Sequence, residues 1–151
     1  MSETILVAID GSDHAWKALD LAAEIAKNRS ARLFIVHVVP YEPMPESLRA
    51  FARAENMPVE EEEARFHYAR IVGDELTRVA EDRARKAGAG EVVARAAEGR
   101  PADQILAQAD AEGASMILMG SRGLSDAKAL LLGSVSHKVA NRATCTCIAV
   151  K

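Results

Sequence analysis

The chain has 151 residues, of which 49% are apolar, and a formal net charge of -3. This length and apolar content suit one compact core, so we expect a single domain over residues 1–151. The charge argues against a nucleic-acid surface, and no apolar run approaches the ~20 residues that span a bilayer. The N-terminus shows no secretory signal, and two cysteines cannot form a secreted disulfide framework. We therefore expect a cytoplasmic protein without nucleic-acid or membrane partners.

Strands and helices alternate in the first part of the chain. Residues 5–9 form a β-branched apolar run, and residues 33–39 form a second one that stops at Pro40. Between the two runs, Ser12 can cap a helix whose apolar residues recur at helical spacing and which stops near Arg29. The order of strand, helix and strand predicts a parallel crossover.

The middle of the chain combines a proline-rich loop with a long helix. Four of the five prolines fall in residues 40–58, which we predict to be a loop with one short helix near residues 46–54. The carboxylates of residues 60–63 then precede a helix that runs to Lys86, where they meet the positive end of its dipole. Its predicted buried stripe comprises Val72, Leu76, Val79, Ala80 and Ala87.

The same alternation continues to the end of the chain. Residues 91–97 form the third strand, and Pro101 stands at the first position of the next helix. Residues 115–119 are an apolar run typical of a strand buried on both faces. A helix over residues 134–142 and a strand over residues 145–150 complete the pattern. It predicts an α/β fold with a five-stranded parallel sheet.

Two glycine segments follow the fourth strand at a defined spacing. The segment Gly120-Ser121-Arg122-Gly123 ends the strand, and nine residues later Gly133-Ser134 opens a helix. Glycines let backbone N–H groups approach an anion, and a helix N-terminus adds unpaired donors and a partial positive charge. This pattern suits a phosphate group. Ordinary turn and cap geometry is the alternative interpretation.

These segments resemble the nucleotide motif of the universal stress protein family, in its UspA-like, ATP-binding subgroup. The similarity covers Gly120-Ser121-Arg122-Gly123, the nine-residue spacer and Gly133-Ser134-Val135-Ser136. It extends to the opening strand with Asp10-Gly11-Ser12 and to the closing strand at residues 145–150, leaving out residues 41–70. The resemblance implies a doubly wound, Rossmann-like sheet of order 3-2-1-4-5 with helices on both faces.

In a sheet of this order, a ligand binds outside the carboxyl ends of the strands, between the first and the fourth. Asp10 follows the first strand and Gly120 ends the fourth, so the two segments are predicted to share one crevice. A turn or capping role is the alternative for Asp10.

The resemblance implies that this crevice holds ATP, with Mg²⁺ carried mainly by the phosphates. It places Asp10 beside the ribose or base, and Val38 or Val39 beside the adenine ring. A phosphate contact by Arg122 or Lys128 stays open, since either side chain can be solvated instead. The predicted site residues are Ala8, Ile9, Asp10, Val38, Val39, Met119, Gly120, Ser121, Arg122, Gly123, Gly133, Ser134, Val135 and Ser136.

Other candidate residues favour structural roles. The four histidines show no paired ligand spacing, and His37 within an apolar strand is expected to be a satisfied core histidine, so no metal site is predicted. Cys145 and Cys147 point to the same face of a strand with Cα atoms about 6.6 Å apart, at the outer limit for a disulfide. We expect structural thiols rather than a redox pair.

The predicted function is a nucleotide-binding regulatory or stress-response protein, a sensor or switch with little or no ATP turnover. No lysine of the Walker type, paired histidine or general base accompanies the glycines, so no catalytic residue is predicted. The alternatives are a slow ATPase or adenylyl-transferring enzyme, and a dimeric scaffold for another small ligand. The strand over residues 145–150 is expected at an open edge of the sheet, which predicts a homodimer through it.

Overall fold

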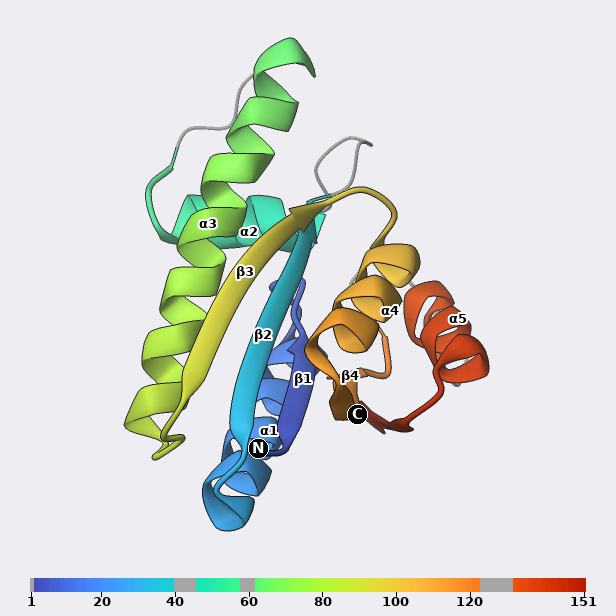
Figure 1. Cartoon of the computed structure of the whole chain (residues 1–151). Coiled ribbons are helices and arrows are strands. Elements are labelled where there is room, and N and C mark those ends of the chain that lie inside the picture. The colour runs from blue at the N-terminus through green and yellow to red at the C-terminus, as the bar shows by residue number, and fades with distance from the viewer. Residues whose placement is uncertain (1, 40–45, 58–61, 123–131) are drawn as a thin grey trace.

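A computed structural model describes residues 2–39, 46–57, 62–122 and 132–151, without the side chains of residues 62–65. Five parallel strands form one sheet in the order β3-β2-β1-β4-β5, which confirms the predicted α/β, Rossmann-like fold (Figure 1). The strands are β1 (Thr4–Ala8), β2 (Arg32–Val39), β3 (Val92–Glu98), β4 (Ala114–Gly120) and β5 (Thr146–Val150). The helices are α1 (Asp13–Arg29), α2 (Glu46–Ala54), α3 (Glu62–Lys86), α4 (Pro101–Glu112) and α5 (Ser134–Arg142).

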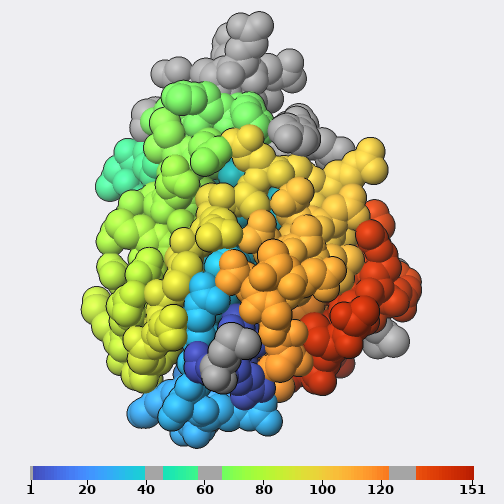
Figure 2. All heavy atoms as spheres, in the orientation of Figure 1, coloured from blue at the N-terminus to red at the C-terminus, as the bar shows by residue number. Residues whose placement is uncertain are grey.

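Helices cover both faces of the sheet. One apolar cluster joins α1, α2 and α3 to residues of β1 and β2 such as Ile5 and Leu33. A second cluster, with Phe34 and Ile117, joins the opposite face to α4 and α5. Seen from the side of Figure 1, α3, α4 and α5 lie across the molecular surface from left to right (Figure 2). The sheet is therefore the middle of three layers.

The helix ends follow the local sequence. The Ser12 side chain accepts a hydrogen bond from the backbone N of Ala15, and Ser30 closes α1 in the left-handed conformation with φ 53°. Pro101 occupies the first turn of α4, and Gly113 ends that helix at φ 62°. Both glycine and proline stand where their backbone preferences place them at helix termini.

The buried stripe of α3 differs in part from its prediction. Val72, Leu76 and Ala80 are fully buried, but Val79 is half-buried and Ala87 is exposed. Ala84 replaces Ala87 in the core because it lies four residues after Ala80, on the same side of the helix. Ala87 falls beyond the last helical residue. In the region predicted as a loop, α2 spans the expected residues, whereas residues 40–45 and 58 lie outside the described part.

Strand β5 stands at one edge of the sheet. It pairs with β4, and within the described residues no strand pairs with its other side. Cys145 and Cys147 are free, half-buried thiols that pack against the core on the α4 and α5 side, and burial raises the pKa of both. This environment agrees with structural thiols. Among the described helices, none combines the length and the apolar content that a bilayer crossing requires.

Candidate functional site

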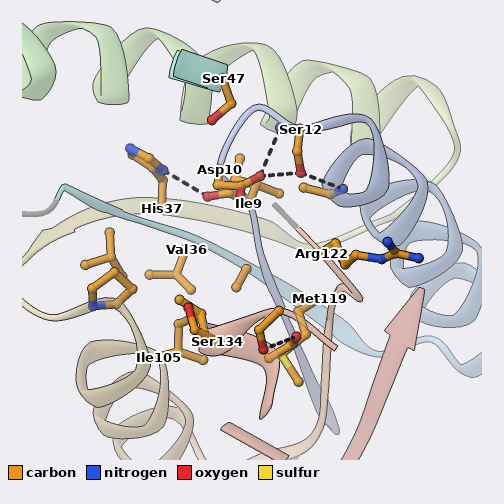
Figure 3. A pocket seen from close by; sticks show the side chains of 18 of the residues that line it. Ile9, Asp10, Ser12, Val36, His37, Ser47, Ile105, Met119, Arg122 and Ser134 are labelled. Carbon is orange, nitrogen blue, oxygen red and sulfur yellow. Dashed lines mark hydrogen bonds between the residues drawn. The ribbon is translucent and has the colours of Figure 1, made fainter. Parts of the chain in front are cut away.

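A cavity of about 190 Å³ opens where β1, β2 and β4 end, beside the N-termini of α4 and α5 (Figure 3). It lies at the position where strand order reverses, between β1 and β4. Eleven of the fourteen predicted site residues line it: Ala8, Ile9, Asp10, Val38, Met119, Gly120, Arg122, Gly133, Ser134, Val135 and Ser136. The fold thus brings the end of β1 together with both glycine segments.

Two of the described predicted residues, Val39 and Ser121, do not line the cavity. Val39 packs into the core on the α3 side because successive side chains of a strand point to opposite faces, and Val38 takes the cavity side. Ser121 is 1% exposed and lies beneath the lining. Gly123 is outside the described residues, as is Lys128 in the spacer.

Further lining residues were absent from the predicted site, and those of α2 and α4 come from elements that the sequence prediction had not connected with it. Val36 lies two residues before Val38, so the alternation of β2 was a usable signal for it. Pro101 and Ile105 come from the first turns of α4, and Ser47 and Leu48 come from α2, for which the local pattern gave no signal. The added residues are Ser12, Ala15, Val36, His37, Ser47, Leu48, Pro101 and Ile105.

Asp10 has the turn role that its position suggested, and it also faces the cavity. Its Oδ1 accepts hydrogen bonds from the backbone N of Ser12 at 2.9 Å and from the Ser12 hydroxyl at 2.5 Å. Gly11 between them has φ +86°, a conformation that favours glycine. Asp10 is exposed, and its Oδ2 accepts no hydrogen bond from the described residues. Oδ1 of Asp10 therefore fixes the turn, while Oδ2 has no hydrogen-bond partner among the described residues.

The start of α5 is tied to the end of β4. The backbone N of Gly133 donates to the carbonyl of Ser121 at 2.6 Å. The Ser136 hydroxyl lies 3.0 Å from the same carbonyl and 3.1 Å from that of Gly133, and donates to both. The Ser136 hydroxyl therefore links the two glycine segments, and its proton is already engaged. The donors that remain in the first turn are the backbone N–H groups of residues 134–136 and the exposed Ser134 hydroxyl.

Gly120 is required by the packing of α1. A Cβ added at Gly120 would lie 2.8 Å from the Cβ of His14 and 3.0 Å from the backbone N of Ala15. The first turn of α1 therefore occupies the space that a side chain would need. Arg122 lines the cavity, but its guanidinium points away from Asp10 and Ser134 (Figure 3).

His37 is buried at the edge of the cavity. Its Nδ1 donates to the carbonyl of Ile9 at 2.9 Å, and burial lowers the pKa of its imidazole. Its Nε2 is buried with no partner in the described part of the chain. The prediction of a satisfied core histidine is correct for one ring nitrogen only. In the described ranges, no cluster of three or more histidine, cysteine or acidic residues forms a metal site.

Comparison with known proteins gives a consistent assignment. The model of the universal stress protein family matches residues 1–151. The chain is 37% identical to universal stress protein YxiE of Bacillus subtilis over 153 residues, with 100% of both chains covered. It is 30% identical to a universal stress protein solved in complex with cAMP, with a TM-score of 0.67 and coverage of 99% and 96%. A universal stress protein from Archaeoglobus fulgidus in complex with dAMP is 26% identical, with a TM-score of 0.69 and coverage of 99% and 98%.

The family match covers the described sheet, the cavity at its switch point and both glycine segments. The identity to YxiE extends over the full length of both chains rather than over the glycine motif alone. The chain belongs to the universal stress protein family.

Proposed function

We propose that the cavity binds ATP and that the protein is a regulatory, stress-response nucleotide sensor with little or no turnover. The observation that carries the proposal is the meeting of Asp10 and the α5 N-terminus in one cavity. A hydrogen-bond acceptor and a set of backbone donors then stand in one cavity lined by apolar side chains. These are the groups that a ribose, a phosphate chain and a base require.

The two ends of ATP would meet different surfaces. The N–H groups of the first turn of α5 suit the phosphates, because they are unpaired within the helix and carry its positive dipole end. Asp10 suits a ribose hydroxyl, since an ionised carboxylate only accepts. Val38, Ile105 and Met119 supply apolar surface for the adenine ring.

Two structural neighbours support the nucleotide class. One was solved with cAMP and the other with dAMP, and both ligands contain adenine. The neighbour with cAMP makes a cyclic monophosphate the second candidate, in place of a triphosphate. Both candidates use the adenine and phosphate surfaces of the cavity, and they differ in how much of the α5 N-terminus they engage.

Mg²⁺ would be carried mainly by the phosphates. Among the described lining residues, Asp10 carries the only carboxylate, and one of its oxygens already accepts two hydrogen bonds from Ser12. One available carboxylate oxygen suits a cation that keeps most of its water and phosphate ligands. Within the described residues, the donor set fits nucleotide-bound magnesium and offers no separate protein cage.

Slow turnover follows from the groups available for catalysis. Phosphoryl transfer needs positioned cations and a residue that orients the attacking water. The titratable side chains of the described lining are Asp10, which holds the turn through Ser12, and His37, whose Nδ1 is bound to the Ile9 carbonyl. The lining also supplies backbone amides, hydroxyls and Arg122, whose guanidinium points away from Asp10 and Ser134 (Figure 3). Binding that does not favour the transition state leaves the rate of the chemical step unchanged. A slow ATPase or an adenylyl-transferring enzyme is the alternative.

Native mass spectrometry of freshly purified protein tests the proposal, because it reports bound nucleotide and subunit number together. We expect a mass increment equal to ATP, with or without magnesium, on a dimer that forms through β5. A cAMP increment supports the second candidate. Another small-molecule increment supports the scaffold interpretation and contradicts ATP as the ligand. The cytoplasmic location stays a prediction.

A further inference from the structure

We propose that His14 is a positioning residue for the phosphate-binding end of the cavity and that it acts through the side chain of Ser121. The inference rests on the proposed function of the same site. His14 does not line the cavity, and no pattern in the sequence singled it out. Its Nδ1 lies 3.0 Å from the Ser121 hydroxyl, and the two groups share a hydrogen bond between residues 107 positions apart.

Ser121 connects three elements of the fold. Its backbone N donates to the carbonyl of Val150 in β5 at 2.7 Å. Its carbonyl accepts from the backbone N of Gly133 at 2.6 Å and from the Ser136 hydroxyl at 3.0 Å. The residue is 1% exposed, so a lost hydrogen bond is not replaced by bulk water. The hydroxyl is the remaining polar group of Ser121, and His14 is its partner.

The first turn of α1 holds His14 firmly in place. The space beside the Cα of Gly120 is filled by the Cβ and carbonyl carbon of His14, at 2.8 and 3.0 Å from where a Cβ would stand. Ser12 caps this turn and is itself bound to Asp10. His14 therefore reaches Ser121 from a helix start that is capped and closely packed against Gly120, which makes it a suitable anchor.

The hydrogen bonds form a chain from α1 to α5. His14 orients Ser121, and the Ser121 carbonyl takes the donors of Gly133 and Ser136. The direction of the remaining N–H groups of α5 depends on those two contacts. Loss of the His14 contact should therefore loosen the phosphate end of the cavity. The apolar walls at Val38 and Ile105 lie outside this chain, so nucleoside contacts should persist.

Calorimetric titration with ATP and with adenosine, up to millimolar concentrations, separates this role from a general structural one. His14→Phe keeps a ring but removes the hydrogen bond, and Ser121→Ala removes its partner. We expect each variant to bind ATP about tenfold more weakly, the usual scale for one partly buried hydrogen bond, and to bind adenosine within about twofold of wild type. The double variant should lose no more than either single variant.

Two further variants sharpen the test. His14→Asn places a polar atom where Nδ1 stands, so it should restore most of the ATP affinity. His67→Phe changes an exposed histidine of α3 that does not line the cavity, and it should bind ATP like wild type. Unchanged ATP affinity in His14→Phe, or equal losses for ATP and adenosine, overturns the role of His14 and leaves the proposed function intact. Wild-type protein that binds no ATP overturns both.

Discussion

The Nδ1–H of His37 donates to the carbonyl of Ile9 at 2.9 Å, which joins the C-terminal part of β2 to the residue before Asp10. Since a carbonyl only accepts, the neutral ring carries its proton on Nδ1 and leaves Nε2 as an acceptor. That Nε2 is buried and has no partner in the described part of the chain. A charged ring would carry a second N–H, on Nε2, for which the described residues offer no acceptor.

Stability should therefore fall in mild acid. Burial lowers the folded-state pKa of His37 below its ordinary value of about 6.5, so the unfolded chain binds the proton first. The stabilisation from neutral His37 is complete above the ordinary pKa of the unfolded chain. It is lost as the pH falls from there through the lowered pKa of the folded state. In this range the free energy of unfolding can fall by about 1.4 kcal/mol per pH unit. Urea unfolding between pH 8 and pH 5 measures it, and His37→Gln should flatten the profile. Parallel profiles for the two proteins would refute this assignment.

Gly120→Ala should destabilise the protein even without a ligand. Its Cβ would meet the backbone of α1 at 3.0 Å and the Cβ of His14 at 2.8 Å, and neither can move alone. Overpacking of this kind costs about 1–3 kcal/mol. Gly90→Ala is the matched control, because an added Cβ there meets nothing within 4 Å. Chemical unfolding of both variants decides the matter, and equal stabilities would show that α1 can shift to accommodate the side chain.

The open edge of β5 predicts a two-fold dimer. Thr146 and Ala149 are exposed, and half-buried Ile148 and Val150 lie along the same strand. The Val150 carbonyl faces β4, where it accepts from Ser121, so the N–H of the preceding Ala149 points to the outer edge. Ala149→Pro removes that donor without touching the β4 ladder. Light scattering should give a dimer for wild type at micromolar concentration and a monomer for the variant. A wild-type monomer would contradict the assignment.

Steady-state phosphate release tests the expected low turnover. We expect fewer than roughly 1 ATP hydrolysed per second, the lower range of ordinary enzymes. Gly133→Val serves as the control for contaminating activity, because its side chain would obstruct the phosphate end. Faster release that disappears in Gly133→Val would assign the protein to the enzymes.

The sequence was most informative about the turns and helix ends that surround the cavity, where single residues determine the backbone geometry. The glycine spacing located both the end of a strand and the start of a helix, and Ser12 and Pro101 marked helix starts, because these effects are local. Which side chains of β2 face the cavity depends on the helices that cover each side of the sheet. Val38 and Val39 therefore stayed alternatives until those helices were known. Ser47 and Ile105 reach the cavity only through the packing of α2 and α4. The linkage of His14 to Ser121 spans 107 positions and carries no sequence signature.

Isothermal titration with ATP of wild type, Gly133→Val and the control Gly90→Val tests whether the start of α5 binds the phosphates. Gly133 has an extended backbone, φ -70° and ψ 165°, which valine can adopt, so the variant should fold and melt cooperatively. Gly90 stands in open space away from the cavity lining. We predict that wild type and Gly90→Val bind ATP with equal affinity, while Gly133→Val shows no binding. ATP binding by Gly133→Val with wild-type affinity would contradict the phosphate site at the start of α5. No ATP binding by wild type would contradict ATP as the ligand.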